Sequence, residues 1–114
     1  MDFQANKEGN VTVVKITGRL DAVTAPEYEK NVRELIDAGG KRFVVDVQGL
    51  DYISSAGLRG LLVTAKLLKA KGGQVRLAHV KGTVKEVFDI SGFGSIFPMD
   101  ETVIASVAAL SEVP

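Results

Sequence analysis

The order of apolar and polar residues divides the chain into short strand-like and helix-like segments. Runs rich in β-branched residues predict strands, and apolar residues three or four positions apart predict helices that bury one face. Strands are expected at 3–5, 11–16, 43–47, 75–80 and 96–97. Helices are expected within 24–38, 58–68, 83–91 and 100–110, the last with Val103, Ile104, Val107 and Leu110 on its apolar side.

Turn and capping residues set the expected ends of these segments. Gly9-Asn10 suits a hairpin turn between the first two strands, and Gly18 to Asp21 is expected to be a strand exit. Thr24-Ala25-Pro26-Glu27 and Thr83-Val84-Lys85-Glu86 both have the form of a capping box, in which the Thr accepts the N–H of the Glu. Asp100 is expected to cap the last helix.

Strand and helix alternate along the chain, and this predicts an α/β protein. The segment 43–47 is apolar at nearly every position, as expected for a central strand covered on both faces. We expect a mixed central sheet of about four to five strands packed against about four helices. No linker or repeat interrupts the pattern, so residues 1–114 are expected to form a single domain.

Composition narrows the functional classes. Fourteen basic and fourteen acidic side chains leave the chain formally neutral, which argues against binding to nucleic acid or to an anionic membrane surface. The absence of Cys removes disulfides, thiolate catalysis and sulfur-ligated metals. No apolar run reaches the length of a membrane helix, and residues 1–10 lack the apolar core of a signal peptide. A soluble, cytoplasmic protein is expected.

The candidate chemistry lies in residues 50–62, where an apolar strand leads into a helix. Ser54 and Ser55 fall at the start of that helix, where backbone N–H groups lack helical partners and the macrodipole is positive. One of the two serines can be a plain N-cap, and an anion can also be held there. The spacing alone leaves both interpretations open.

Three stretches together resemble the STAS domain family, in particular the bacterial anti-sigma factor antagonists. The stretches are 18–25 (GRLDAVTA), 50–58 (LDYISSAGL) and 87–93 (VFDISGF), and their order and spacing match over almost the whole chain. The resemblance implies a regulator that binds an anti-sigma factor and thereby frees a sigma factor. In that family the anti-sigma factor is also a serine kinase of the histidine-kinase-like ATPase fold, and a serine phosphatase reverses its action.

The resemblance also implies which residues carry the switch. Aligned on Gly57-Leu58, the phosphoacceptor position of the family falls on Ser55. Ser54 stands where most members have Asp, and it is a possible second hydroxyl; Ala56 stands where a further hydroxyl is common. Phosphorylation of Ser55 would end the complex with the kinase.

The expected partner-binding surface contains residues from two segments. Asp21 matches a polar position of the family's binding surface, although it can also simply order its turn, and Thr24 can be no more than a cap. Arg59 can contact a carboxylate of the partner or stay solvated. Glycine in a helix is unfavourable, so Gly57 suggests close packing against the sheet beneath or a partner above. The expected partner-binding residues are Asp21, Thr24, Ser54, Ala56, Gly57 and Arg59.

The sequence gives little support to an enzyme. It contains no phosphate-binding loop and no hydrolase elbow, and His79 is its only His, so no base for Ser55 and no metal site is expected. No cofactor is expected. The alternative from the same family is a stand-alone accessory subunit that binds a transporter or its ATPase without a phosphorylation cycle. A strand edge leaves monomer or weak dimer open.

Overall fold

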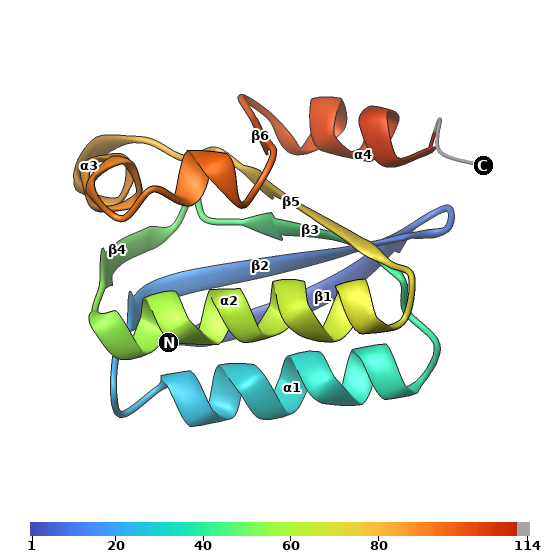
Figure 1. The fold of residues 1–114 in the computed structure, drawn as a ribbon, viewed down its shortest axis with the longest axis horizontal. Coiled ribbons are helices and arrows are strands. Elements are labelled where there is room, and N and C mark those ends of the chain that lie inside the picture. Colours follow the sequence, from blue (N-terminus) through green and yellow to red (C-terminus); the bar gives the residue numbers. More distant parts are fainter. Residues whose placement is uncertain (112–114) are drawn as a thin grey trace.

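One twisted β-sheet organises residues 1–111, the part of the chain that the computed structural model describes (Figure 1). The strands are β1 (Asp2–Glu8), β2 (Val11–Leu20), β3 (Arg42–Asp46), β4 (Leu50–Ile53), β5 (Gln74–Ala78) and β6 (Met99–Asp100). The helices are α1 (Ala25–Asp37), α2 (Ser55–Ala70), α3 (Gly82–Ile90) and α4 (Val103–Ser111), with a 3₁₀ turn η1 (Phe93–Ser95) before β6. The α/β class and the mixed sheet with four helices are confirmed.

The sheet has six strands: five lie in the order β1-β2-β3-β5-β6, and β4 pairs with the end of β2 off this path. β1 and β2 form an antiparallel hairpin, and the other pairs are parallel. The hairpin turn at Gly9-Asn10 and the central position of β3 are confirmed. β1 is therefore an edge strand along its whole length.

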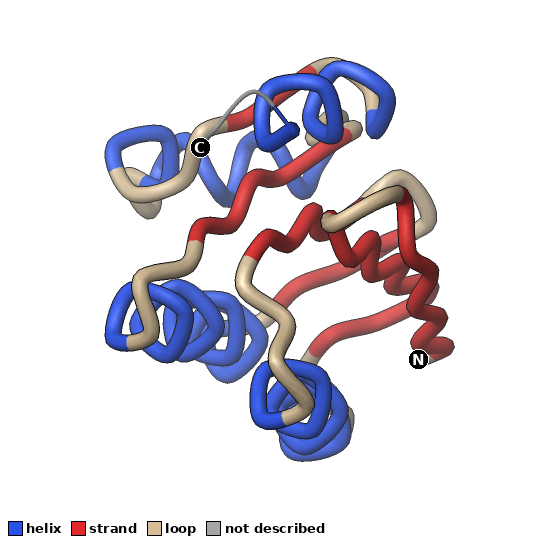
Figure 2. The backbone as a smooth tube through the Cα atoms, turned by 90° about the vertical axis from the view of Figure 1, so that its right-hand side faces the viewer, coloured by secondary structure: helices blue, strands red, loops and turns tan. Residues whose placement is uncertain are grey.

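Helices cover both faces of the sheet. α1 and α2 lie side by side on one face, and α4 lies across the other (Figures 1 and 2). The larger core cluster is on the α1/α2 side and includes Tyr28, Phe43, Leu61 and Leu68. A smaller cluster beneath α4 consists of Val11, Val13, Val44, Ala78 and Leu110.

The segment before α1 differs from the sequence prediction in two ways. Residues 18–21 are not a strand exit, because β2 continues to Leu20. Gly18 has φ +93°, a conformation that favours glycine, and the register of the β2–β4 pair shifts between Gly18 and Arg19. Thr24 is the N-cap residue of α1 as expected, but the capping box is wrong, since the Thr24 side chain makes no cap hydrogen bond to α1.

Two predictions for residues 83–97 are wrong. α3 begins at Gly82, one residue before Thr83, so the second capping box does not exist; its cap residue is Lys81. Residues 96–97 are not a strand, because Phe97 is buried against Phe93 with their ring centroids 5.2 Å apart. The last strand is Met99–Asp100, on the other side of the proline.

Asp100 does not cap α4. Its carboxylate lies within β6, where it accepts hydrogen bonds from Arg76 Nε at 2.6 Å and from the Ser106 hydroxyl at 2.7 Å. The N–H of Ala105 is accepted by Thr102 Oγ1 at 3.0 Å. On α4 itself, Ile104 is not on the buried side as expected, because 82% of it is exposed.

Candidate functional site

The first turn of α2 separates the roles of the two serines. Ser54 is the N-cap, with an extended backbone (φ −98°, ψ 177°) and a side chain whose Oγ accepts the Gly57 N–H at 3.3 Å. Its own N–H donates to the Leu20 carbonyl at 3.0 Å, which ties the start of α2 to the end of β2. Ser54, not Ser55, is therefore the serine that caps the helix.

Ser55 occupies the first helical position and is exposed. Its hydroxyl makes no hydrogen bond to any of residues 1–111. The first N–H groups of a helix lack partners within the helix, and the macrodipole makes this end favourable for negative charge. A phosphoryl group on Ser55 would therefore sit at the end of α2 that tolerates it, outside the core.

Gly57 lies beneath the two serines and allows α2 to approach β2. A Cβ on Gly57 would meet the Leu20 carbonyl oxygen at 2.4 Å and Ile53 Cγ1 at 2.7 Å. At Gly60, one turn later, an added Cβ would meet Tyr28 Cδ2 of α1 at 3.4 Å, an ordinary contact. Both glycines are buried. The close packing expected at Gly57 is therefore against the ends of β2 and β4, which contribute Leu20 and Ile53.

Asp21 and Thr24 stabilise the loop between β2 and α1. Asp21 Oδ1 accepts the N–H of Val23 at 3.0 Å and of Thr24 at 3.2 Å. These hydrogen bonds, with the one to the Thr24 backbone largest, lower the pKa of the Asp21 carboxyl. The Thr24 hydroxyl accepts the Asp21 N–H and lies 2.9 Å from the Arg19 carbonyl. Both side chains thus hold the loop beside the start of α2 in one conformation.

Arg19 and Tyr52 form a second exposed feature at this end of the molecule. The guanidinium carbon of Arg19 lies 4.1 Å from the centroid of the Tyr52 ring, and Arg19 Nε lies 3.5 Å from Asp21 Oδ2. They face each other because they are register partners in the β2–β4 pair. The sequence analysis missed this pair because it did not predict β4, whose two buried positions, Leu50 and Ile53, are three residues apart and lack the alternation of a half-buried strand.

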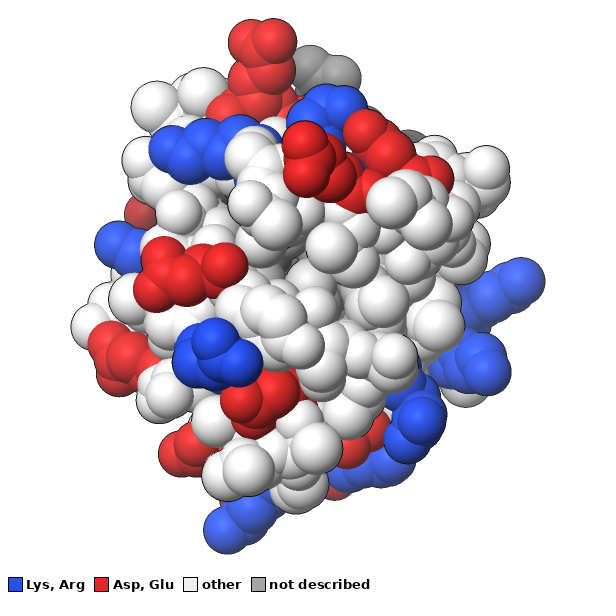
Figure 3. Space-filling view, turned by 90° about the vertical axis from the view of Figure 1, so that its left-hand side faces the viewer, with Lys and Arg blue, Asp and Glu red and all other residues white. Residues whose placement is uncertain are grey.

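The remaining predicted residues lie around the same helix start. Ala56 is half-buried, while Arg59 is exposed and has no ion pair with any of residues 1–111. The loop before α1 adds Val23, which is 85% exposed. Figure 3 shows this end of the molecule, at the left of Figure 1; its middle is uncharged, and acidic and basic side chains surround it. The arrangement is a mixed polar and apolar surface rather than a cleft.

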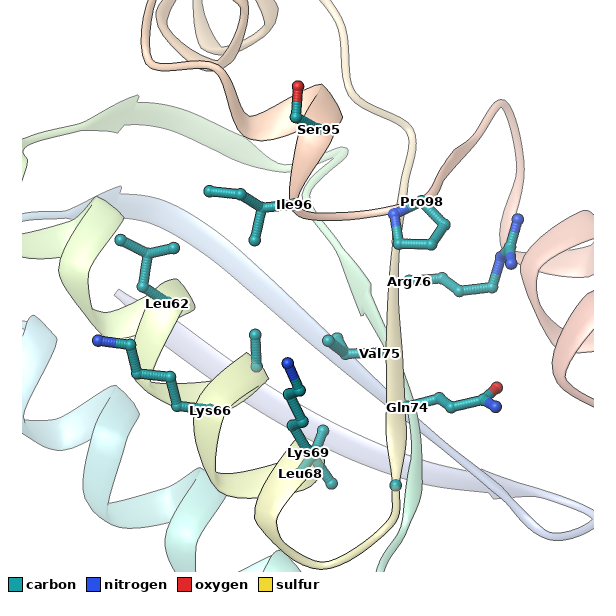
Figure 4. Close-up of a pocket in the computed structure, with 12 residues that line it drawn as sticks. Leu62, Lys66, Leu68, Lys69, Gln74, Val75, Arg76, Ser95, Ile96 and Pro98 are labelled. Carbon is teal, nitrogen blue, oxygen red and sulfur yellow. The ribbon is translucent and has the colours of Figure 1, made fainter.

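A hollow of about 620 Å³ lies elsewhere, between the second half of α2, β5 and the segment after η1 (Figure 4). Lys66 and Lys69 stand at its border, and Arg76 is held by Asp100. Ser54 and Ser55 do not line this hollow. Within residues 1–111 there is no group of three or more His, Asp or Glu side chains placed to hold a metal ion, and none of the helices has both the length and the apolar character that crossing a bilayer needs.

The chain is similar to known proteins along nearly its whole length. Residues 2–106 match the family model of the STAS domain. BtrV of Bordetella bronchiseptica, whose name places it provisionally among the anti-sigma factor antagonists, is 38% identical over 109 residues, which cover 96% of this chain and 94% of BtrV.

Two solved proteins have the same fold. A Thermotoga maritima protein provisionally named an anti-sigma factor antagonist superposes with a TM-score of 0.91 at 17% identity, covering 96% of this chain and 95% of that one. The unphosphorylated anti-sigma factor antagonist SpoIIAA superposes with a TM-score of 0.78 at 21% identity, covering 98% of this chain and all of SpoIIAA. The Bacillus SpoIIAA has also been solved in a phosphorylated form, with a TM-score of 0.74, 21% identity, and 95% and 99% coverage.

Proposed function

Because this chain belongs to the STAS domain family, we propose that it is an anti-sigma factor antagonist that binds an anti-sigma factor through the surface around Ser55. The 38% identity to BtrV over almost both chains supports this function. The composition of the surface also supports it, because protein interfaces are enriched in arginine and aromatic residues. Arg19, Tyr52 and Val23 are exposed at this end of the molecule.

We propose that phosphorylation of Ser55 switches the antagonist off. The observation that carries this proposal is an exposed hydroxyl with no hydrogen bond to residues 1–111, one residue after the serine that caps the helix. The anti-sigma factor would act as the kinase: Ser55 Oγ attacks the γ-phosphorus of ATP, ADP leaves, and the hydroxyl proton passes to a base of the kinase. A serine phosphatase would return the free hydroxyl by hydrolysis with water.

The charge change explains how one modification ends binding without unfolding the antagonist. A phosphoserine carries about −1.5 to −2 charges at pH 7, which a helix N-terminus accommodates. In a packed interface the same group must lose its hydration, and without a cationic partner this costs several kcal/mol. A loss of about 3 to 4 kcal/mol weakens binding by two to three orders of magnitude.

The serine at position 54 is compatible with this function. Ser54 caps α2, because its side-chain oxygen accepts the Gly57 N–H. Asp and Ser are about equally good N-cap residues, so the serine preserves the cap that the family's more common Asp would provide. Asp21 and Thr24 would contribute by holding the adjacent loop in one conformation. Arg59, which has no ion pair within residues 1–111, would offer a cation to the partner.

The test is affinity capture from lysate of the source cell with five baits: wild type, Ser55→Ala, Ser55→Asp, Ser54→Asp and Asn10→Asp. We expect an anti-sigma factor of the histidine-kinase-like ATPase fold with wild type, Ser55→Ala and Ser54→Asp, and its loss with Ser55→Asp. Ser54→Asp is the matched control, since it places the same charge one residue away and keeps the cap. Asn10→Asp adds a control charge at the hairpin turn, at the far end of the molecule (Figure 1).

Incubation of the captured partner with ATP then tests the acceptor. We expect phosphate on wild type and on Ser54→Ala, and none on Ser55→Ala. Equal capture of the anti-sigma factor by all baits would refute the switch and leave antagonism standing. Recovery of a transporter or its ATPase in place of an anti-sigma factor would refute antagonism and favour the accessory-subunit alternative.

A further inference from the structure

α4 differs in composition from the other helices of residues 1–111. Its nine residues, Val103–Ser111, include no charged side chain, whereas α1, α2 and α3 each carry at least three. A helix that packs on a sheet with one side normally shows charged and polar residues to water on the other. A helix that is apolar all round is normally covered on both sides.

Residues 1–111 cover only one side of α4. Ser106 and Leu110 are buried towards the sheet. On the opposite side, Ile104 is 82% exposed, and the small residues Ala105 and Ala108 are exposed beside it. This side of α4 is therefore an apolar surface centred on one large protruding side chain.

Two hollows border that side chain. One, of about 450 Å³, lies where the start of α4 meets the β1–β2 hairpin, and the other, of about 390 Å³, lies along α4. Ile104 and Glu8 line both hollows. β1 does not extend under α4 as β2, β3 and β5 do, and this leaves the hairpin side of the helix open (Figure 2).

We propose that this surface, defined by α4 and the hollow it forms with the β1–β2 hairpin, binds a second copy of this chain. A two-fold dimer uses the same patch on both copies, so the patch must contain both a protrusion and a recess. Here Ile104 is the protrusion and the two hollows are the recesses, and they adjoin one another.

The charges at this surface also suit a second copy. Glu8 and Lys15 are both exposed and line the same hollow, so a two-fold contact can place Glu8 of each copy against Lys15 of the other. A patch of one sign would instead repel itself, and the chain as a whole is formally neutral. α2 begins at the opposite end of the molecule from α4, so both Ser55 surfaces would stay open in the dimer (Figure 1).

The test is sedimentation of the full chain from about 10 µM to about 1 mM, a range in which weak self-association becomes measurable. We expect the weight-average mass to rise with concentration towards twice that of one chain. Ile104→Lys should abolish the rise, and Ile90→Lys should not. The two isoleucines are matched, being 82% and 88% exposed, so neither change should unfold the protein, and circular dichroism checks this.

Cross-linking gives a second, independent measurement. The chain contains no Cys, so Ile104→Cys and Ile90→Cys each introduce a single thiol. A short bis-maleimide should link Ile104→Cys into dimers and leave Ile90→Cys monomeric. The proposal is overturned by a constant monomer mass up to the highest concentration, by self-association that Ile104→Lys leaves intact, or by loss of the dimer with Ile90→Lys.

Discussion

Replacing Gly57 with Ala tests whether the start of α2 rests as closely on β2 as the structure shows. In an ordinary helix this change would stabilise the protein, because Ala is favoured over Gly by about 1 kcal/mol. Here the new methyl group would stand 2.4 Å from the Leu20 carbonyl oxygen and 2.7 Å from Ile53 Cγ1. A backbone oxygen has no rotamer to move into, so the helix start itself must shift.

The expected size of the effect follows from these contacts. Forcing a methyl group into a packed site costs about 1 to 3 kcal/mol. Moving the helix start away from β2 also breaks the 3.0 Å hydrogen bond from the Ser54 N–H to the Leu20 carbonyl, which contributes about 1 kcal/mol. After the gain in helix propensity of about 1 kcal/mol is subtracted, Gly57→Ala should lower the free energy of unfolding by about 1 to 3 kcal/mol.

The assay is urea unfolding at 25 °C with the slope m compared between variants. Gly60→Ala is the matched control in the same helix, because its Cβ would meet Tyr28 Cδ2 at 3.4 Å and nothing closer. It should raise the free energy of unfolding, or leave it unchanged. A Gly57→Ala variant as stable as the wild type, or equal shifts in the two variants, would refute the close contact between α2 and β2.

Three further predictions concern hydrogen bonds of the described residues, each checked by urea unfolding. Ser54→Ala should lower the free energy of unfolding by about 1 kcal/mol, while Ser54→Asp should restore it. Asp100→Asn should destabilise the protein at pH 7. The hydrogen bond from Arg76 lowers the pKa of Asp100 below its usual 3.8, so the stability from this pair is present above pH 3.8 and is lost as the pH falls through the lowered pKa of the folded protein. The difference in the free energy of unfolding between wild type and variant should therefore shrink as the pH falls below 3.8. Tyr28→Phe should cost about 1 kcal/mol, because the buried Tyr28 hydroxyl lies 2.7 Å from Thr64 Oγ1.

The sequence was sufficient for the elements with strong local signals. β2, β3, α1 and α2 follow from β-branched runs and from helical spacing, and the glycines after each helix mark its end. The weak points were places where a long-range contact overrides the local pattern. Residues 96–97 have the apolar character of a strand, yet Phe97 instead packs against Phe93. Asp100 was expected to cap α4, but its carboxylate pairs with Arg76 of the neighbouring strand β5.

At the candidate site, too, some features could be predicted from the sequence and others depend on long-range contacts. The resemblance placed Ser54, Ser55 and Asp21 at one end of the molecule, and the structure brings the loop of Asp21 against the start of α2 through the Leu20 carbonyl. Which serine caps the helix depends on backbone dihedrals, which spacing alone does not fix. The Arg19–Tyr52 contact depends on the pairing of β4 with β2, two segments about thirty residues apart, so no local pattern could reveal it.

Separate serines for the cap and for the proposed phosphoacceptor make a switch that leaves the fold intact. If one side chain did both, the phosphoryl group would be attached to the oxygen that accepts the Gly57 N–H, at a half-buried position where α2 is tied to β2. Ser54 keeps that hydrogen bond whatever happens at the next residue, and negative charge at the first helical position is mildly favourable, by about 0.3 to 1 kcal/mol. A phosphoryl group on Ser55 would therefore weaken binding to the partner while leaving the free energy of unfolding of the antagonist almost unchanged.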